Sequence, residues 1–373
     1  MKRLLLLLPL PLLCLLLLSG CWDHKDTNAL LIVAGAALDL DEEGHTCVTA
    51  EVLSFAQSGS ADAESHLLRG KGETLFDAFG DLLKKSGKEL YWQHSAVLIL
   101  GRAYAEKGLG ELFDCILNNN EFRLTLDLAV SGLEKAGDVF SLDPLDRKII
   151  SFAVDRRIYE GEKLGYTIRK PAFGALNAFL SGLRDFALPL VREGEDGVIE
   201  VSGCAAFREG KMVGTIDAVQ AQQIQLLDSM LADMELSFHT PELSCVVHLG
   251  SFRPKIELSQ KEGCFLADVH VDAQYEVLMC VEENPMPKSA RTEKIEALCR
   301  DRLCLALEET NRHFAALSCD LFGWGERIYR KDPDAYEKDP RSFAEKVVIR
   351  PEFSLHERLE GLSGAAVDQE GGG

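Results

Sequence analysis

The chain has 373 residues, of which 60 are Asp or Glu and 40 are Lys or Arg, which gives a formal net charge of -20 at pH 7. A protein this acidic repels phosphate backbones and anionic head groups, so the charge argues against nucleic-acid binding and against a polybasic contact with lipid. With 46% hydrophobic residues the chain can bury substantial cores, and its length predicts two or three domains rather than one compact domain.

The first twenty residues have the form of a bacterial lipoprotein signal peptide. Lys2 and Arg3 supply the positive start, residues 4–18 the apolar stretch, and residues 18–21 (Leu-Ser-Gly-Cys) a lipobox. The apolar stretch is shorter than the roughly 20 residues that a membrane-spanning helix needs, so a retained anchor is the weaker alternative. The sequence predicts a signal peptide over residues 1–20 and lipidation of Cys21, with the rest of the chain as a soluble body on the outer face of a membrane.

Residues 21–193 are predicted to form an N-terminal α/β region of one or two subdomains. A buried strand over residues 29–38 turns at residues 41–44 into a second strand over residues 46–55, which makes a hairpin. Residues 57–72 are small and polar, so we expect an exposed loop there, and residues 74–85 have helical spacing.

The second half of this region alternates between strands and helices. A strand over residues 95–100, a helix over residues 102–118 and a strand over residues 124–130 give the order βαβ. Residues 143–185 are predicted to be mostly helical, with the clearest apolar face over residues 172–183.

A composition shift at residues 193–197 (Glu-Gly-Glu-Asp-Gly) marks a candidate linker, and residues 198–361 are predicted to form a C-terminal α+β domain. It opens with a hairpin over residues 198–216 that turns at Glu209-Gly210. A helix over residues 217–231 and antiparallel strands within residues 243–281 follow.

A long helix is predicted from Ser289 to about Phe322, because apolar residues recur there at spacings of three and four. We expect it to lie across the C-terminal sheet, with Phe314 and Leu317 as anchors. Alternatively, Trp324 and its bulky neighbours form an exposed patch that docks on a partner.

The chain ends in a predicted strand over residues 346–355 and a glycine-rich tail, residues 362–373, that we expect to be disordered. Together these elements predict an α+β, multi-domain fold in which mixed sheets pack with helices and the C-terminal domain holds a long helix.

The sequence shows no common catalytic or nucleotide-binding motif: GxGxxG, the P-loop, GxSxG and HExxH are all missing, and the nine histidines are scattered. We therefore expect no enzymatic activity, no cofactor and no metal. His94, just before a buried strand, is expected to be a structural histidine rather than a ligand or catalytic base. Asp23, His24 and Asp26 suggest a cation site, but a polar tether next to the membrane explains them at least as well.

The chain has 11 cysteines, of which Cys14 would leave with the signal peptide and Cys21 would take the lipid. The remaining nine cannot all pair, and none forms a CxxC motif. Because most of them lie inside apolar runs, we expect buried free thiols.

Six short blocks follow one another in a recognisable order. They are Gly20-Cys21-Trp22-Asp23 with the strand that follows, residues 72–78, Leu90-Tyr91-Trp92-Gln93-His94, residues 120–124 (Asn-Glu-Phe-Arg-Leu), residues 202–207 with residues 211–214, and residues 320–325 with Pro333. In this order, behind a lipobox, they resemble the Ger(x)C family of spore germination lipoproteins.

This resemblance implies a non-catalytic subunit of a nutrient germinant receptor, acting in spore germination beside two integral membrane subunits. It implies a lipid-anchored location on the outer face of the spore inner membrane, contact with the bilayer through the acylated Cys21, and a body of up to three mixed α/β domains. The alternative from another class is an extracytoplasmic solute-binding lipoprotein of a transport system, which would need a deep cleft between two domains. A third reading is an exported hydrolase.

Overall fold

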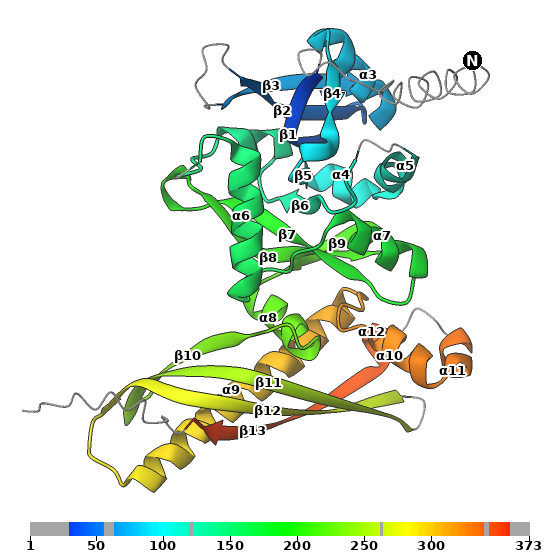
Figure 1. Cartoon of the computed structure of the whole chain (residues 1–373). Helices are drawn as coiled ribbons and strands as arrows, with labels where there is room; N and C mark the ends of the chain where they lie inside the picture. Colours follow the sequence, from blue (N-terminus) through cyan, green and yellow to red (C-terminus); the bar gives the residue numbers. More distant parts are fainter. Residues whose placement is uncertain are drawn as a thin grey trace, which may run out of the picture.

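The structure is a computed structural model that describes residues 30–55, 63–118, 122–145, 147–261, 264–338 and 343–358. Within these residues the chain forms one nine-stranded and one four-stranded sheet, and the two sheets occupy opposite ends of the molecule (Figure 1). The predicted α+β fold with mixed sheets and a long C-terminal helix is confirmed.

The nine-stranded sheet has a parallel centre flanked by antiparallel strands. Its order is β3-β2-β1-β5-β6-β7-β8-β9, and β4 pairs with β1. Strands β1, β5, β6 and β7 are parallel, whereas β2 and β3 on one side and β8 and β9 on the other are antiparallel to their neighbours. The strands are β1 (Leu30–Leu40), β2 (Thr46–Phe55), β3 (Ala63–Gly72), β4 (Glu89–Tyr91), β5 (Val97–Leu100), β6 (Asp127–Ser131), β7 (Phe186–Glu193), β8 (Ile199–Arg208) and β9 (Lys211–Ile216).

The β1–β2 hairpin forms as predicted, but the exposed loop expected over residues 57–72 is wrong for its second half. Residues 63–72 form β3, which pairs with β2 along its whole length, from Ala63 opposite Phe55 to Gly72 opposite Thr46. Backbone pairing at a sheet edge does not require apolar side chains, so a polar segment can form a strand there. Residues 56–62 lie outside the described part.

Helices cover both faces of the nine-stranded sheet. Its first face packs on α3 (Leu75–Ser86), α4 (Arg102–Lys107), α5 (Gly110–Asn118) and α7 (Ala172–Ser181). The other face packs on α6 (Ile150–Lys163) and the short helix η3 (Ala136–Ser141). Two further short helices are η2 (Trp92–His94) and η4 (Glu195–Gly197).

The single helix expected over residues 102–118 is instead two helices. Gly108 interrupts it with φ +119°, a conformation that residues with a Cβ atom rarely adopt. The helix predicted from residue 74 forms as expected, because the Thr74 hydroxyl accepts a hydrogen bond from the Asp77 N–H and caps its first turn.

The four-stranded sheet has the order β10-β11-β12-β13, and α9 crosses one of its faces (Figure 1). β11 is antiparallel to both of its neighbours, β10 and β12, whereas β13 runs parallel to β12. Its elements are α8 (Ala218–Leu227), β10 (Asp233–His239), β11 (Leu243–Lys261), β12 (Cys264–Glu282), α9 (Lys288–Ala316), α10 (Trp324–Lys331), α11 (Pro333–Lys338), α12 (Phe343–Lys346) and β13 (Val347–Glu357).

The β8–β9 hairpin turns at Glu209-Gly210 as predicted, with φ of +52° and +75°. The predicted boundary at residues 193–198 falls between β7 and β8, and across it β8 pairs with β7, so that β8 and β9 complete the nine-stranded sheet. The side chains of β8 pack into two different cores. Ala205 and Phe207 join the helix-covered core of the first sheet, whereas Cys204 and Ala206 join the core built around α9.

Helix α9 is shorter than predicted. It ends at Ala316 rather than near Phe322, and Ser318 follows with φ +50°. Phe314 is buried as expected, while Leu317 is only half-buried. Beyond the turn, Phe322 folds back to 4.8 Å from the Phe314 ring, measured between centroids.

The expectation of an exposed patch around Trp324 is wrong. Trp324 is 1% exposed, and its indole N–H donates a hydrogen bond to Asn311 Oδ1 at 3.1 Å. Its ring contacts Phe322 edge-on at 5.5 Å. Trp324 is therefore a core residue of the C-terminal part.

Candidate functional site

The predicted lipidation site, Cys21, lies outside the described residues, as do Asp23, His24 and Asp26. The first described residue, Leu30, pairs with Glu89 of β4. The chain therefore enters the fold beside β4, just after the end of α3. Among the described residues, no helix is both long and apolar enough to cross a membrane.

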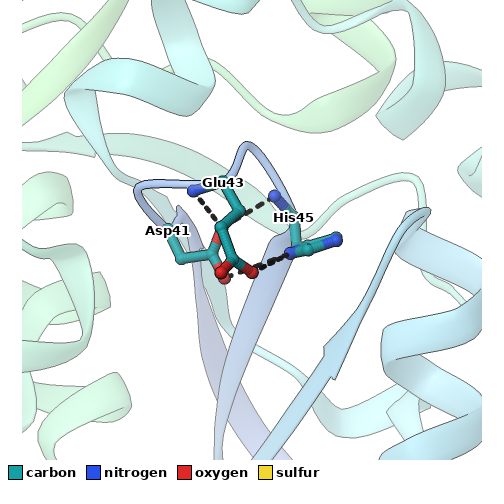
Figure 2. Close-up of side chains that lie close together, drawn as sticks. All are labelled: Asp41, Glu43 and His45. Carbon is teal, nitrogen blue, oxygen red and sulfur yellow. Dashed lines mark hydrogen bonds and ion pairs between the residues drawn. The ribbon is translucent and has the colours of Figure 1, made fainter.

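The β1–β2 turn gathers three ligand-type side chains, Asp41, Glu43 and His45 (Figure 2). Asp41 Oδ1 accepts hydrogen bonds from the backbone N–H groups of Glu43, at 3.0 Å, and His45, at 2.9 Å. His45 Nδ1 lies 3.1 Å from Glu43 Oε2 and 3.4 Å from Asp41 Oδ2. This arrangement is the local chemistry of a tight turn, in which an Asp side chain bonds the backbone two and four residues on.

Lys71, on the neighbouring strand β3, already supplies a cation to this turn. Its Nζ lies 2.5 Å from Asp41 Oδ2 and 3.4 Å from Glu43 Oε2. The bond from Lys71 holds the pKa of Asp41 well below its usual range. A metal ion at this turn would have to displace the Lys71 ammonium group. We therefore interpret the cluster as structural: it holds the β1–β2 turn against strand β3.

His94 is exposed at the end of η2 rather than packed into a core. Its ring lies 5.4 Å from the Tyr91 ring, measured between centroids. The nine cysteines of the described residues are free thiols, as predicted, but not all of them are buried. Five are buried, at positions 115, 204, 245, 299 and 319, whereas Cys264 is exposed and Cys47, Cys280 and Cys304 are partly buried.

A cluster of charged side chains lies where the two parts of the molecule meet. Arg184, between α7 and β7, donates from Nη1 and Nη2 to the two carboxylate oxygens of Asp228, at 3.0 Å and 2.7 Å. Its Nη2 also donates to the Leu321 carbonyl at 2.6 Å. A Cβ at Gly323 would lie 2.8 Å from Arg184 Cδ, so the absence of a side chain there lets the arginine reach its partners.

Two carboxyl groups lie beside this arginine. The Asp320 N–H donates to Asp185 Oδ2 at 2.8 Å, and Asp320 itself accepts from the N–H groups of Trp324, at 2.8 Å, and Gly325, at 2.7 Å. Burial raises the pKa of Asp320 to about 6, and the charge of Asp185 adds to the rise. Burial also raises the pKa of Asp185.

A cavity of about 340 Å³ opens at the same junction. Its walls are Phe179 and Phe186 from the first part, Phe343 from the second, and the polar groups of Arg184, Asp185, Arg208 and Asp320. This volume is at the small end of ligand sites. Because Arg184 is bonded to Asp228 and Asp320 to backbone N–H groups, the arrangement works chiefly as a joint between the two cores.

The sequence does not predict this joint. Asp320 lies in the last of the blocks that carry the family resemblance, and no pattern singles out Arg184, Asp185 or Asp228. The available signal was a charged pair, Arg184-Asp185, set between an apolar helix and a buried strand.

Comparison with known proteins matches nearly the whole chain. The model of the spore germination protein N-terminal domain matches residues 23–193, and the model of the spore germination B3/GerAC-like C-terminal domain matches residues 202–356. The crystal structure of the GerBC protein superposes with a TM-score of 0.58 and 14% identity, covering 87% of this chain and 96% of that one.

Two relatives from Bacillus subtilis (strain 168) agree with these matches. Spore germination protein A3 is 22% identical over 262 residues, which are 68% of each chain. Spore germination protein KC is 20% identical over 370 residues, which cover 91% of this chain and 90% of the relative. The chain belongs to the Ger(x)C family of spore germination proteins.

Proposed function

We propose that this protein is the lipid-anchored subunit of a nutrient germinant receptor and acts, without catalysing a reaction, beside integral membrane subunits. Its place would be the outer face of the spore inner membrane. The proposal rests chiefly on the position of the lipobox next to the family match in the sequence. The lipobox ends at Cys21, and the match to the family's N-terminal domain begins at residue 23. Only Trp22 separates the expected lipidation site from the first residue that matches the family.

The joint between the two cores supports a role in which the body acts as a unit. Arg184 donates hydrogen bonds to Asp228, which follows α8, and to the carbonyl of Leu321, in the segment between α9 and α10. The β8–β9 hairpin also packs into both cores. A body joined in this way can transmit force or position between a membrane and a partner more directly than two domains on a flexible linker.

The test is the substitution Cys21→Ala in the native gene. We expect loss of lipid labelling, loss of the protein from the spore membrane fraction, and a germination defect for a subset of nutrients. Treatments that bypass receptors should still trigger germination. Wild-type membrane recovery together with normal germination, in a strain without paralogous receptors, would refute the proposal.

The solute-binding alternative is less well supported, because the junction cavity of about 340 Å³ is small and its polar groups already have partners. Gene neighbours separate the two functions. Genes for integral membrane germination proteins favour the receptor, whereas a permease and an ATPase favour transport.

A further inference from the structure

We propose that the outward side of α3, with the lysines at its end, rests on the bilayer and takes an anionic lipid surface as its partner. The surface consists of Phe76, Leu83, Lys84 and Lys88 and is called the α3 face below. The inference rests on the proposed lipid anchor at Cys21.

The α3 face carries exposed apolar side chains that the core does not use. Phe76 is 54% exposed and Leu83 is 51% exposed. They are seven residues apart, so they lie on the same side of the helix, two turns from each other. Leu75, Ala78 and Leu82 are buried on the opposite side. An outward Phe and Leu on an amphipathic helix are the groups that enter the boundary between head groups and acyl chains.

Lysines cluster at the C-terminal end of the same helix. Lys85 pairs with Asp81 at 2.7 Å, but Lys84 and Lys88 are exposed and make no ion pair with any described residue. In a chain with a net charge of -20, these two lysines place positive charge directly beside outward apolar groups. Of the two carboxylates of α3, Asp81 pairs with Lys85, and Asp77 lies at the other end of the helix, where it bonds the Thr74 cap.

The short segment between Cys21 and Leu30 limits how far the α3 face can lie from the membrane. Nine residue steps separate Cys21 from Leu30, and at 3.3–3.6 Å per step they reach at most about 32 Å. Leu30 pairs with Glu89, the residue after Lys88. The four-stranded sheet and α9 lie at the other end of the molecule (Figure 1), so the end that carries α3 is the one held near the lipid.

The overall acidity does not prevent this contact. Charges in solution are screened beyond about 8 Å at physiological ionic strength, so an anionic surface senses the residues that face it rather than the net charge. We expect each unpaired lysine at the surface to strengthen binding about fivefold.

Lysine footprinting of the full-length mature protein tests the α3 face. A water-soluble acylating reagent is applied to the lipidated protein on phosphatidylglycerol-containing vesicles and to the Cys21→Ser chain free in solution. Mass spectrometry then gives the labelling of each lysine. We expect Lys84 and Lys88 to be protected on vesicles, while Lys255, which is distant and exposed, labels equally in both samples. Equal labelling of Lys84 and Lys88 would overturn the proposal.

A second measurement uses the Cys21→Ser chain on the same vesicles, without help from lipid. Lys84→Gln/Lys88→Gln should weaken its partition by about 25-fold, the product of two fivefold losses. The matched pair Arg253→Gln/Lys255→Gln should leave it unchanged. Phe76→Ser/Leu83→Ser should also weaken partition, whereas Leu305→Ser on α9 should not. Because these side chains are exposed, thermal unfolding should be the same for all variants.

The outcomes separate this proposal from the anchor. If the lipidated wild-type protein does not sediment with vesicles, the proposed anchor fails. If it does sediment but Lys84 and Lys88 remain reactive, the α3 face is wrong and the anchor stands. Protection that appears only in spore membranes, and not on protein-free vesicles, would assign the face to a membrane protein and refute the bilayer as its partner.

Discussion

At the level of single residues, Arg184 is the side chain on which the junction depends most. It forms a bidentate ion pair with Asp228 and also donates a hydrogen bond to the Leu321 carbonyl. Only a guanidinium can supply parallel donors in a plane together with a further donor to a carbonyl. Its loss would leave the Asp228 carboxylate in a partly buried site with only the longer contact from Arg327, at 3.6 Å.

We therefore expect Arg184→Ala to lower the free energy of unfolding by about 2 to 3 kcal/mol, less than the loss of one partner of a fully buried pair, because the side chains of Arg184 and Asp228 are 25% and 21% exposed. Arg184→Lys keeps the positive charge but cannot form the bidentate contact with Asp228. Its loss of unfolding free energy should therefore be intermediate. Arg102→Ala, which breaks an exposed pair with Glu106, is the matched control and should cost less than about 1 kcal/mol. Thermal and urea unfolding measure all three. Equal effects of Arg184→Ala and Arg102→Ala would contradict the assigned joint.

Asp320 should make the stability of the protein depend on pH. Its pKa in the folded protein is about 6, above the value of about 3.9 expected in the unfolded chain. The folded protein therefore holds the proton more tightly, so this contribution is full below about pH 3.9 and is lost as the pH rises through 6. Compared with Asp320→Asn, the wild type should gain roughly 1 kcal/mol between about pH 7 and about pH 5. Parallel pH profiles for the two proteins would show that another group is responsible.

Local sequence patterns predict the burial of some of these residues but not of others. The burial of Phe314 was predicted because its own helix carries a periodic apolar stripe. Trp324 could not be placed in the same way, because its burial depends on Ser318 turning the chain back onto α9. Arg184 and Asp228 are 44 residues apart, and nothing local in either segment indicates the other.

At the level of elements, α6 begins without a cap of its own. Its preceding residue, Ile149, makes no side-chain cap bond. Glu51 of β2 replaces the cap from about 100 residues away: its carboxylate accepts from the N–H groups of Ile150, at 2.9 Å, and Ser151, at 2.7 Å, and from the Ser151 hydroxyl at 2.6 Å. The negative charge also complements the positive end of the helix dipole.

Glu51→Gln should lower the free energy of unfolding by about 2 to 3 kcal/mol. The amide keeps the shape but has one acceptor oxygen in place of two, so it leaves a buried donor unsatisfied. Glu64→Gln on the exposed strand β3 changes the same groups at the surface and should stay within about 0.5 kcal/mol. Chemical denaturation measures both. Near-wild-type stability of Glu51→Gln would mean that α6 does not need this cap.

Packing of α9 into the C-terminal core provides a further test. Phe314 is 2% exposed and contacts the Phe322 ring, so Phe314→Ala should cost about 3 to 5 kcal/mol. Glu308→Ala, on the solvent side of the same helix, should change stability by no more than about 0.5 kcal/mol. The comparison is made by the melting temperature of the full chain. No shift in Phe314→Ala would refute the packing of α9.

The elements themselves were largely predictable, for reasons that differ from one to the next. The long alternating run of β12 and the stripe of α9 are each many residues long, so their periods are unambiguous. Strand β3 was missed because pairing with β2, and not its own composition, makes it a strand. The break at Gly108 was missed because one glycine does not reveal its φ angle.

At the level of the whole molecule, the pairing of distant strands decides where one part ends. The charge-rich segment around residue 195 looks like a linker, yet the chain returns after it to pair Ile199 with Glu193 and Phe207 with Phe186. Composition reports local solvent exposure, whereas sheet membership depends on a partner strand. The nine-stranded sheet therefore extends through Ile216, the last residue of β9.

Truncation of the chain at the two candidate boundaries tests this organisation. A fragment of residues 22–193 would leave β7 as an unpaired edge and expose Phe186, which stacks on Phe207 at 5.1 Å, so we expect it to aggregate or to unfold without a cooperative transition. A fragment of residues 22–217 keeps all nine strands and should show cooperative unfolding, although at a lower temperature than the full chain, because Cys204 and Ala206 lose the C-terminal core. Circular dichroism and urea titration of the two fragments make the comparison. If the shorter fragment were the more stable one, the hairpin would belong energetically to the C-terminal part, and strand pairing would be a poor guide to the folding unit.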